Sequence, residues 1–139
     1  MKTQRSTRHA LYAALEMAAT APGELVTAAE VAARHELPPA VVAKVFQRLA
    51  KAGVAIGARG VAGGYRLARP AAEVTVLEVI EVFEKLGSAP RAARAAAVPD
   101  AERRLAGLFA EIDEQVRATL ASVTLATLVS PRPSIGGAR

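Results

Sequence analysis

The sequence predicts a mainly helical fold with one small β-hairpin, an α+β arrangement, and a long C-terminal helix. Three observations support this prediction. Apolar residues recur at helical spacing through most of the chain. Two short alternating segments, residues 54–58 and 65–68, flank a glycine-rich tip, which is typical of a hairpin. Beyond residue 100, apolar residues continue at spacings of three and four for about two dozen residues.

The first two helices are predicted from apolar spacing and from a capping signal. Residues 7–20 carry apolar side chains at helical spacing, and Pro22 lies just beyond their end. Thr27 and Glu30 have the spacing of a capping box, in which each side chain bonds the backbone N–H of the other residue. We therefore expect a second, short helix over residues 28–35.

A third helix and the hairpin follow in the sequence. Pro38 and Pro39 suit the first positions of a helix that runs to about Ala52, and Gly53 fits its C-cap. The inward positions of this helix are Val42, Val45, Phe46 and Leu49. Phe46 and Tyr65 are expected in the core. Helix, short helix, turn, helix and hairpin, in this order, make a winged helix-turn-helix.

The next segment predicts a fourth helix and a loop. Thr75 and Glu78 have the spacing of another capping box, which opens a helix over roughly residues 76–85. Residues 87–99 are of low complexity and are predicted to form a flexible loop. Asp100 then caps the long helix.

The long helix has an apolar stripe and a charged face. A two-sided helix of this length in a small protein needs a partner surface, and the same helix of a second copy is the simplest one. Packing against its own domain is the alternative. Residues 124–129 predict a last helical turn, and residues 130–139 are predicted to be disordered. The expected dimer-interface residues are Leu105, Leu108, Phe109, Ile112, Val116 and Leu120.

Charge divides the chain into two parts. Residues 1–70 hold ten Lys and Arg against four Glu, whereas residues 71–139 hold eight Lys and Arg against nine acidic residues. This division indicates a nucleic-acid-binding domain at residues 1–74 and an assembly or sensing region at residues 75–129. A solvated surface with chance asymmetry is the alternative interpretation.

The composition excludes several classes of protein. The absence of cysteine excludes disulfides and thiolate metal sites. The sequence has no secretory signal and no run of about 18–20 apolar residues, so we expect a cytoplasmic protein without membrane attachment. We expect no enzyme and no cofactor, because the sequence shows no nucleophile beside a histidine, no phosphate-binding loop and no metal-ligand cluster. His9 and His35 are expected to have structural or solvent-facing roles.

The helix-turn-helix is predicted to read double-stranded DNA. Pro39, Ala40 and Val41 open the recognition helix, where apolar contacts with thymine methyl groups are available. Lys44 can reach guanine or a phosphate. The helix N-terminus at Thr27 and Ala28 offers backbone N–H groups that favour a phosphate.

Cations around this helix are predicted to contact DNA. At the hairpin tip, Arg59 can enter a narrow minor groove, and Gly60 lets the backbone approach the surface closely. A solvated face is the alternative for each cation. The residues expected to contact phosphates are Arg5, Arg8, Arg48 and Arg66.

Two stretches of the sequence carry a resemblance to a known family. Residues 59–70 (RGVAGGYRLARP) are similar to the wing of the Rrf-two family of bacterial winged-helix regulators. Residues 45–53 (VFQRLAKAG) are similar to the end of its recognition helix. The order of elements also matches, so the resemblance covers about residues 7–129. The family includes IscR, NsrR and CymR.

The resemblance implies a homodimeric transcriptional regulator, most often a repressor, which binds a two-fold related operator and places the wing arginine, here Arg59, in the minor groove. Cluster-binding members hold an iron–sulfur cluster with three cysteines in the loop that corresponds to residues 87–99. This chain has no cysteine there, so we expect a member without the cluster. The alternative is a regulator whose DNA binding is controlled by a partner protein or small-molecule ligand at the dimerisation half.

Overall fold

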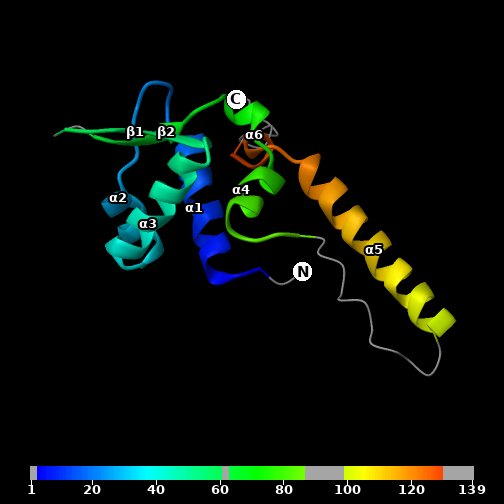
Figure 1. Cartoon of the computed structure of the whole chain (residues 1–139). Helices are drawn as coiled ribbons and strands as arrows, with labels where there is room; N and C mark the ends of the chain where they lie inside the picture. The colour runs from blue at the N-terminus through cyan, green and yellow to red at the C-terminus, as the bar shows by residue number, and fades with distance from the viewer. Residues whose placement is uncertain (1–2, 61–62, 87–98, 130–139) are drawn as a thin grey trace, which may run out of the picture.

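The computed structural model describes residues 3–60, 63–86 and 99–129. Figure 1 shows α1 to α4 and the hairpin gathered together, with α5 extending away from them. The predicted fold class, mainly helical with one small antiparallel hairpin, is confirmed. In chain order the elements are α1 (Arg5–Ala19), α2 (Ala28–His35), α3 (Pro39–Lys51), β1 (Ala55–Ala58), β2 (Gly64–Leu67), η1 (Ala71–Glu73), α4 (Val76–Phe83), α5 (Pro99–Ala121) and α6 (Leu125–Val129).

Helices α2 and α4 each begin at the capping box that the sequence predicted. Thr27 Oγ1 accepts the backbone N–H of Glu30 at 3.0 Å, and Glu30 Oε1 accepts the backbone N–H of Thr27 at 2.9 Å. Thr75 and Glu78 repeat this arrangement at 3.1 Å in both directions. These reciprocal bonds satisfy backbone donors that a helix start would otherwise leave without partners.

The start of α1 and the end of α4 differ from the prediction because these two ends meet. Glu84 Oε2 accepts the backbone N–H of Gln4 at 2.9 Å and the hydroxyl of buried Thr7 at 2.5 Å. Glu84 takes an extended conformation, and α4 ends at Phe83, two residues before the predicted end. α1 begins at Arg5, two residues before its predicted start.

The hydrophobic core forms where α1 packs against α3, α4 and α6. The four inward residues predicted for α3 are all buried. They meet alanines of α1, whose small side chains let the helices approach closely. Buried members of the core include Ala10, Ala13, Ala14, Val42, Val45, Phe46, Leu49, Val79 and Leu125.

The hairpin is fixed on two sides. The ring of Tyr65 on β2 stacks on Phe46 of α3, with ring centroids 4.6 Å apart and an interplanar angle of 11°, which confirms the predicted core role of both residues. Tyr65 also exchanges backbone hydrogen bonds of 2.8 and 2.9 Å with Val26, just before α2. At the tip, Gly60 has a φ of +110°, and a Cβ on Gly63 would lie 2.5 Å from a backbone oxygen, so both positions require glycine.

α5 contains 23 residues, and none of them is buried. At its C-terminal end, Arg117 bonds the carboxylate of Glu81 and, at 3.2 Å, the carbonyl oxygen of Leu86. The prediction that Asp100 caps this helix is wrong, because α5 begins at Pro99 and Asp100 lies inside the first turn. Proline suits that first position because its missing N–H has no partner there in any case.

The predicted last helical turn is α6. Two backbone hydrogen bonds of 2.9 Å hold the connection between α5 and α6 against the start of α4: Val76 N–H donates to Val123, and Leu125 N–H donates to Val74. The loop predicted at residues 87–99 lies, apart from Pro99, outside the described residues, and so does the tail predicted at 130–139. Within the described segments, no helix is both long and apolar enough to cross a bilayer.

Candidate nucleic-acid interface

The N-terminal end of α3 presents the predicted base-reading residues to solvent. Pro38 is the N-cap of this helix, and proline also occupies its first turn. Val42 and Val45 turn inward and are buried, which leaves the neighbouring positions on the outer side. The exposed side chains there are those of Pro39, Ala40, Val41 and Lys44.

A pocket of about 560 Å³ lies between this end of α3 and the first turns of α1. Arg5 and Arg8 line it from α1, and Val41 lines it from α3. The structure therefore brings three of the predicted site residues together. Sequence analysis missed other residues of this pocket because they are far apart in the sequence and meet only through the packing of α1 on α2. They include His9, Tyr12 and His35.

The Arg and Lys side chains of the described residues differ in whether they make a hydrogen bond or ion pair with another residue. Arg34 pairs with Glu16, and Arg69 pairs with Glu78. The side chains of four predicted contact residues, by contrast, make no hydrogen bond or ion pair with any other described residue: Arg5, Arg8, Lys44 and Arg59. An unheld cation is available to a phosphate without the loss of an internal partner.

Arg48 is held by α4. Its Nη2 donates to the carbonyl oxygen of Val82 at 2.8 Å, and its guanidinium carbon lies 4.1 Å from the centre of the Phe83 ring. This cation–π contact and hydrogen bond link the end of α3 to the end of α4. The structure therefore places Arg48 at a helix–helix contact and not among the unheld cations.

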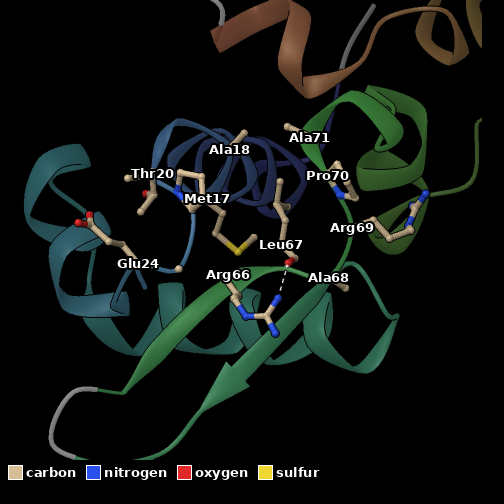
Figure 2. Close-up of a pocket in the computed structure, with 13 residues that line it drawn as sticks. Met17, Ala18, Thr20, Glu24, Arg66, Leu67, Ala68, Arg69, Pro70 and Ala71 are labelled. Atoms are coloured by element: carbon tan, nitrogen blue, oxygen red, sulfur yellow. Dashed lines mark hydrogen bonds between the residues drawn. The ribbon is translucent and has the colours of Figure 1, made fainter.

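Arg66 lies on the side of the hairpin opposite Tyr65 and Leu67, because neighbouring side chains in a strand leave opposite faces. Figure 2 shows Leu67 pointing towards Met17 of α1, whereas the guanidinium of Arg66 lies on the other side of the strand. Its Nη1 donates to the carbonyl oxygen of Leu67 at 3.2 Å. Arg66 also lines a pocket of about 540 Å³ at the end of α1.

The predicted phosphate site at the start of α2 already holds a carboxylate. Hydrogen bonds from the backbone N–H and hydroxyl of Thr27 hold the pKa of Glu30 below its usual value. Glu30 is therefore ionised at neutral pH, and its charge opposes a second anion at this helix end. The backbone N–H groups of Ala28 and Ala29 are the donors that the capping box leaves open.

Arg59 and Gly60 are exposed at the hairpin tip. In Figure 1 the tip projects beyond α2 and α3. Because Tyr65 stacks on Phe46, the hairpin keeps a fixed position relative to α3. A helix end and a projecting tip on one frame can contact two neighbouring grooves of a duplex.

A second surface lies on α5. Its apolar stripe contains large side chains that no described residue covers, while Val116 and Leu120 are partly buried. The exposed fractions are 50% for Leu105, 51% for Leu108, 42% for Phe109 and 44% for Ile112. An exposed apolar patch of this kind marks an interaction surface.

Comparison with known proteins identifies the family. The family model described as "Rrf2: Iron-dependent Transcriptional regulator" matches residues 3–131. The chain belongs to the Rrf2 family. This confirms the resemblance seen in residues 45–53 and 59–70. Its winged-helix structure and its relatives show a DNA-binding transcriptional regulator, not an enzyme.

Individual relatives agree with the family. BadM of Rhodopseudomonas palustris, an HTH-type transcriptional regulator by name, is 36% identical over 129 residues, which are 93% of this chain and 81% of BadM. IscR of Cereibacter sphaeroides is 36% identical over 87 residues, 61% of this chain and 56% of IscR. The structure of CymR (YrzC), the global cysteine regulator of B. subtilis, matches with a TM-score of 0.80 at 25% identity, covering 94% of this chain and 97% of CymR.

The residues of this Rrf2-family chain do not fit an iron–sulfur cluster. Such clusters are held by cysteine thiolates, and the sequence contains no cysteine. Within residues 3–60, 63–86 and 99–129, no three His, Asp or Glu side chains are grouped so that they could hold a metal ion. We therefore assign no step of its action to a cluster.

Proposed function

We propose that the protein is a homodimeric repressor that binds a two-fold related DNA operator and does so without an iron–sulfur cluster. In this proposal, α3 enters the major groove and the hairpin tip places Arg59 in the adjacent minor groove. The protein works in the cytoplasm, which holds the chromosome in bacteria such as its relatives.

The unheld cations carry the DNA-binding part of the proposal. The side chains of Arg5, Arg8, Lys44 and Arg59 have no partner among the described residues and belong to the α1 start, α3 and the hairpin tip. The exposed start of α3 has few hydrogen-bonding side chains, so base reading rests on apolar contacts and most of the affinity comes from phosphates. Arg48 and Arg66 have internal partners, and we assign them a smaller share of the affinity.

The uncovered stripe of α5 supports the dimer. A second copy of α5 can cover the exposed side chains from Leu105 to Ile112 by a symmetric contact. A hollow of about 360 Å³ lined by Ile112, Val116 and Leu120, among others, continues the same surface. It can receive apolar side chains of the second copy.

Selection of bound duplexes from a random pool, with the purified full chain, tests DNA reading and symmetry together. We expect a two-fold related sequence whose half-sites lie about one helical turn, or a multiple of it, apart. A duplex with a single half-site should then bind more weakly. Equal affinity for one half-site would contradict the dimer, and a pool without enrichment would contradict sequence-specific reading.

The repressor assignment has its own test. The selected site is placed across a promoter in a transcription reaction with purified polymerase. Added protein should reduce the amount of transcript, because a dimer on the duplex excludes polymerase. An increase would contradict repression while leaving DNA binding intact.

The pocket in Figure 2 favours a small molecule as the signal that controls DNA binding. A ligand there would touch both the end of α1 and strand β2 of the hairpin. A ligand at about 100 times its Kd stabilises the folded state by about 2.7 kcal/mol, which a thermal-shift screen detects. If purified protein binds its selected site only after addition of a cell extract that has lost its small molecules, a protein partner is the signal instead.

A further inference from the structure

The pocket between α1 and the start of α3 combines positive charge with apolar walls. Arg5 and Arg8 reach it from α1, and none of the described residues that line it is acidic. Leu37, Pro38 and Val41 form an apolar side. A DNA backbone presents both matching surfaces, because a phosphate carries the negative charge and its sugars are largely apolar.

His9 also lines this pocket and is half-buried. Its Nδ1 is buried and has no hydrogen-bond partner among the described residues. A neutral imidazole carries its single proton on one of the two ring nitrogens. In the tautomer in which Nδ1 has no proton, Nε2 carries it and is a hydrogen-bond donor. A phosphate oxygen in the pocket would accept from it.

We propose that this pocket binds one backbone phosphate of double-stranded DNA, with Arg5 and Arg8 as the cations and His9 as a donor whose charge follows pH. This inference rests on the proposed function, because it names a contact within the same interface. It adds a residue that sequence analysis assigned a structural or solvent-facing role.

The groups around His9 determine the direction of the pH effect. Burial lowers the pKa of His9 below its usual value, and the Arg5 and Arg8 guanidiniums lower it further. From α2, His35 lines the same pocket, but it is paired with Glu16 at 3.1 Å and stacked on Tyr12. The residues that α3 and the preceding turn contribute are uncharged.

Two carboxylates lie near but have other partners. Glu16 bonds Arg34 and His35. Glu84 bonds Gln4 and Thr7, and Thr7 faces away from His9 because two residues turn an α-helix by about 200°. Arg5, Arg8 and Tyr12 are the remaining titratable groups that line the pocket from α1.

This arrangement determines whether DNA affinity rises or falls with pH. In the free protein, burial and the two guanidiniums favour the neutral form of His9, because they lower its pKa below the usual value of 6.5. A bound phosphate offsets the repulsion from Arg5 and Arg8 and attracts the imidazolium, so it raises the pKa of His9. DNA binding then takes up a proton, and affinity increases as the pH falls through the pKa of the bound state. Each unit of pKa increase corresponds to a tenfold gain in affinity at low pH.

A histidine titration tests the proposal directly. The chain has two histidines, so ¹H–¹³C spectra contain two ring signals, and the His35→Gln variant assigns them. The full chain is titrated from about pH 5 to 8.5 alone, with inorganic phosphate, and with its selected duplex. We expect the duplex to raise the pKa of His9. Inorganic phosphate, at a concentration equal to that of the backbone phosphates of the duplex, should raise it much less.

Binding measurements provide the second readout. Duplex affinity of the wild-type chain should increase as the pH falls, whereas His9→Gln and His9→Asn should lose this increase. A thermal melt confirms that the His9 variants fold. Duplex binding without a change in the His9 titration overturns the inference and leaves the proposed function standing. An equal effect of inorganic phosphate assigns the pocket to a free anion and also overturns it. If the wild-type chain binds no duplex, both proposals fail.

Discussion

The DNA-reading half and helix α5 use apolar residues in opposite ways. From α1 to the hairpin, most large apolar side chains pack against one another, and Phe46 and Leu49 are fully buried. Along α5, the stripe from Leu105 to Ile112 is 42–51% exposed. The first region completes its own core, and we propose that the second is half of an interface. One sequence rule, apolar residues at helical spacing, thus describes both a core and an exposed stripe.

The largest expected effect lies in the self-contained core. Phe46→Ala removes a fully buried ring that stacks on Tyr65, so we expect the free energy of unfolding to fall by about 3–5 kcal/mol. Urea unfolding followed by circular dichroism measures this loss. The loss should be the same over a wide range of protein concentration. A change below about 1 kcal/mol would contradict a core formed within one chain.

The matching change on α5 should act on assembly. Leu108→Glu puts a charge on the exposed stripe, where burial of each leucine by a second copy is worth about 1.5–3 kcal/mol. We expect the dimer dissociation constant to increase more than tenfold in sedimentation equilibrium. Glu111→Gln, on the charged side of the same helix, is the matched control. A Leu108→Glu variant that dimerises like the wild-type chain would remove the distinction between the two regions.

Within the DNA-reading half, Arg59 tests the role of the unheld cations. Arg59→Ala removes a side chain that has no partner among the described residues, so stability should stay within about 0.5 kcal/mol. Affinity for the selected operator should fall by about 1–3 kcal/mol if the side chain reads a base step. Fluorescence anisotropy measures the affinity. Unchanged binding would remove Arg59 from the interface.

Arg48 should behave in the opposite way. Arg48→Ala breaks the bond to Val82 and the contact with Phe83, so we expect a loss of about 0.5–1 kcal/mol in stability. Urea unfolding measures it, and Arg48→Lys, which keeps the charge, separates geometry from charge. Unchanged stability with weakened DNA binding would restore Arg48 to the predicted phosphate contacts.

The smallest expected effect concerns pH and the start of α2. The pKa of Glu30 is lowered in the folded state by its bonds to Thr27. Its contribution to stability is therefore present above the unfolded value of 4.5 and is lost as the pH falls through the folded pKa. Unfolding of the wild-type chain and of Glu30→Gln should differ at pH 7 and converge at low pH. A constant difference would contradict the capping role.

Local signals predicted most of the fold. The bounds of α2 were predicted from Thr27, Glu30 and the length of the apolar pattern, and the structure has the same bounds. The same kind of signal led to the start of α4 and to the inward face of α3. Two of the ends that differed, the start of α1 and the end of α4, meet through a contact distant in sequence, in which Glu84 accepts the backbone N–H of Gln4.

The candidate site was less accessible to sequence analysis. A count of basic residues cannot distinguish Arg5, whose side chain has no partner among the described residues, from Arg48, whose guanidinium bonds Val82 and lies over the Phe83 ring. It also gives no sign that His9 and His35 line the same pocket, because that depends on how the helices pack. Motifs predicted which surface reads DNA, and the three-dimensional structure showed which side chains on that surface lack a partner among the described residues.

The end of α4 joins three helices within five residues. Val82 and Phe83 hold α3 through Arg48, Glu84 holds the start of α1, and Leu86 holds α5 through Arg117. We therefore expect that local opening of this short segment breaks its contacts with all three helices together.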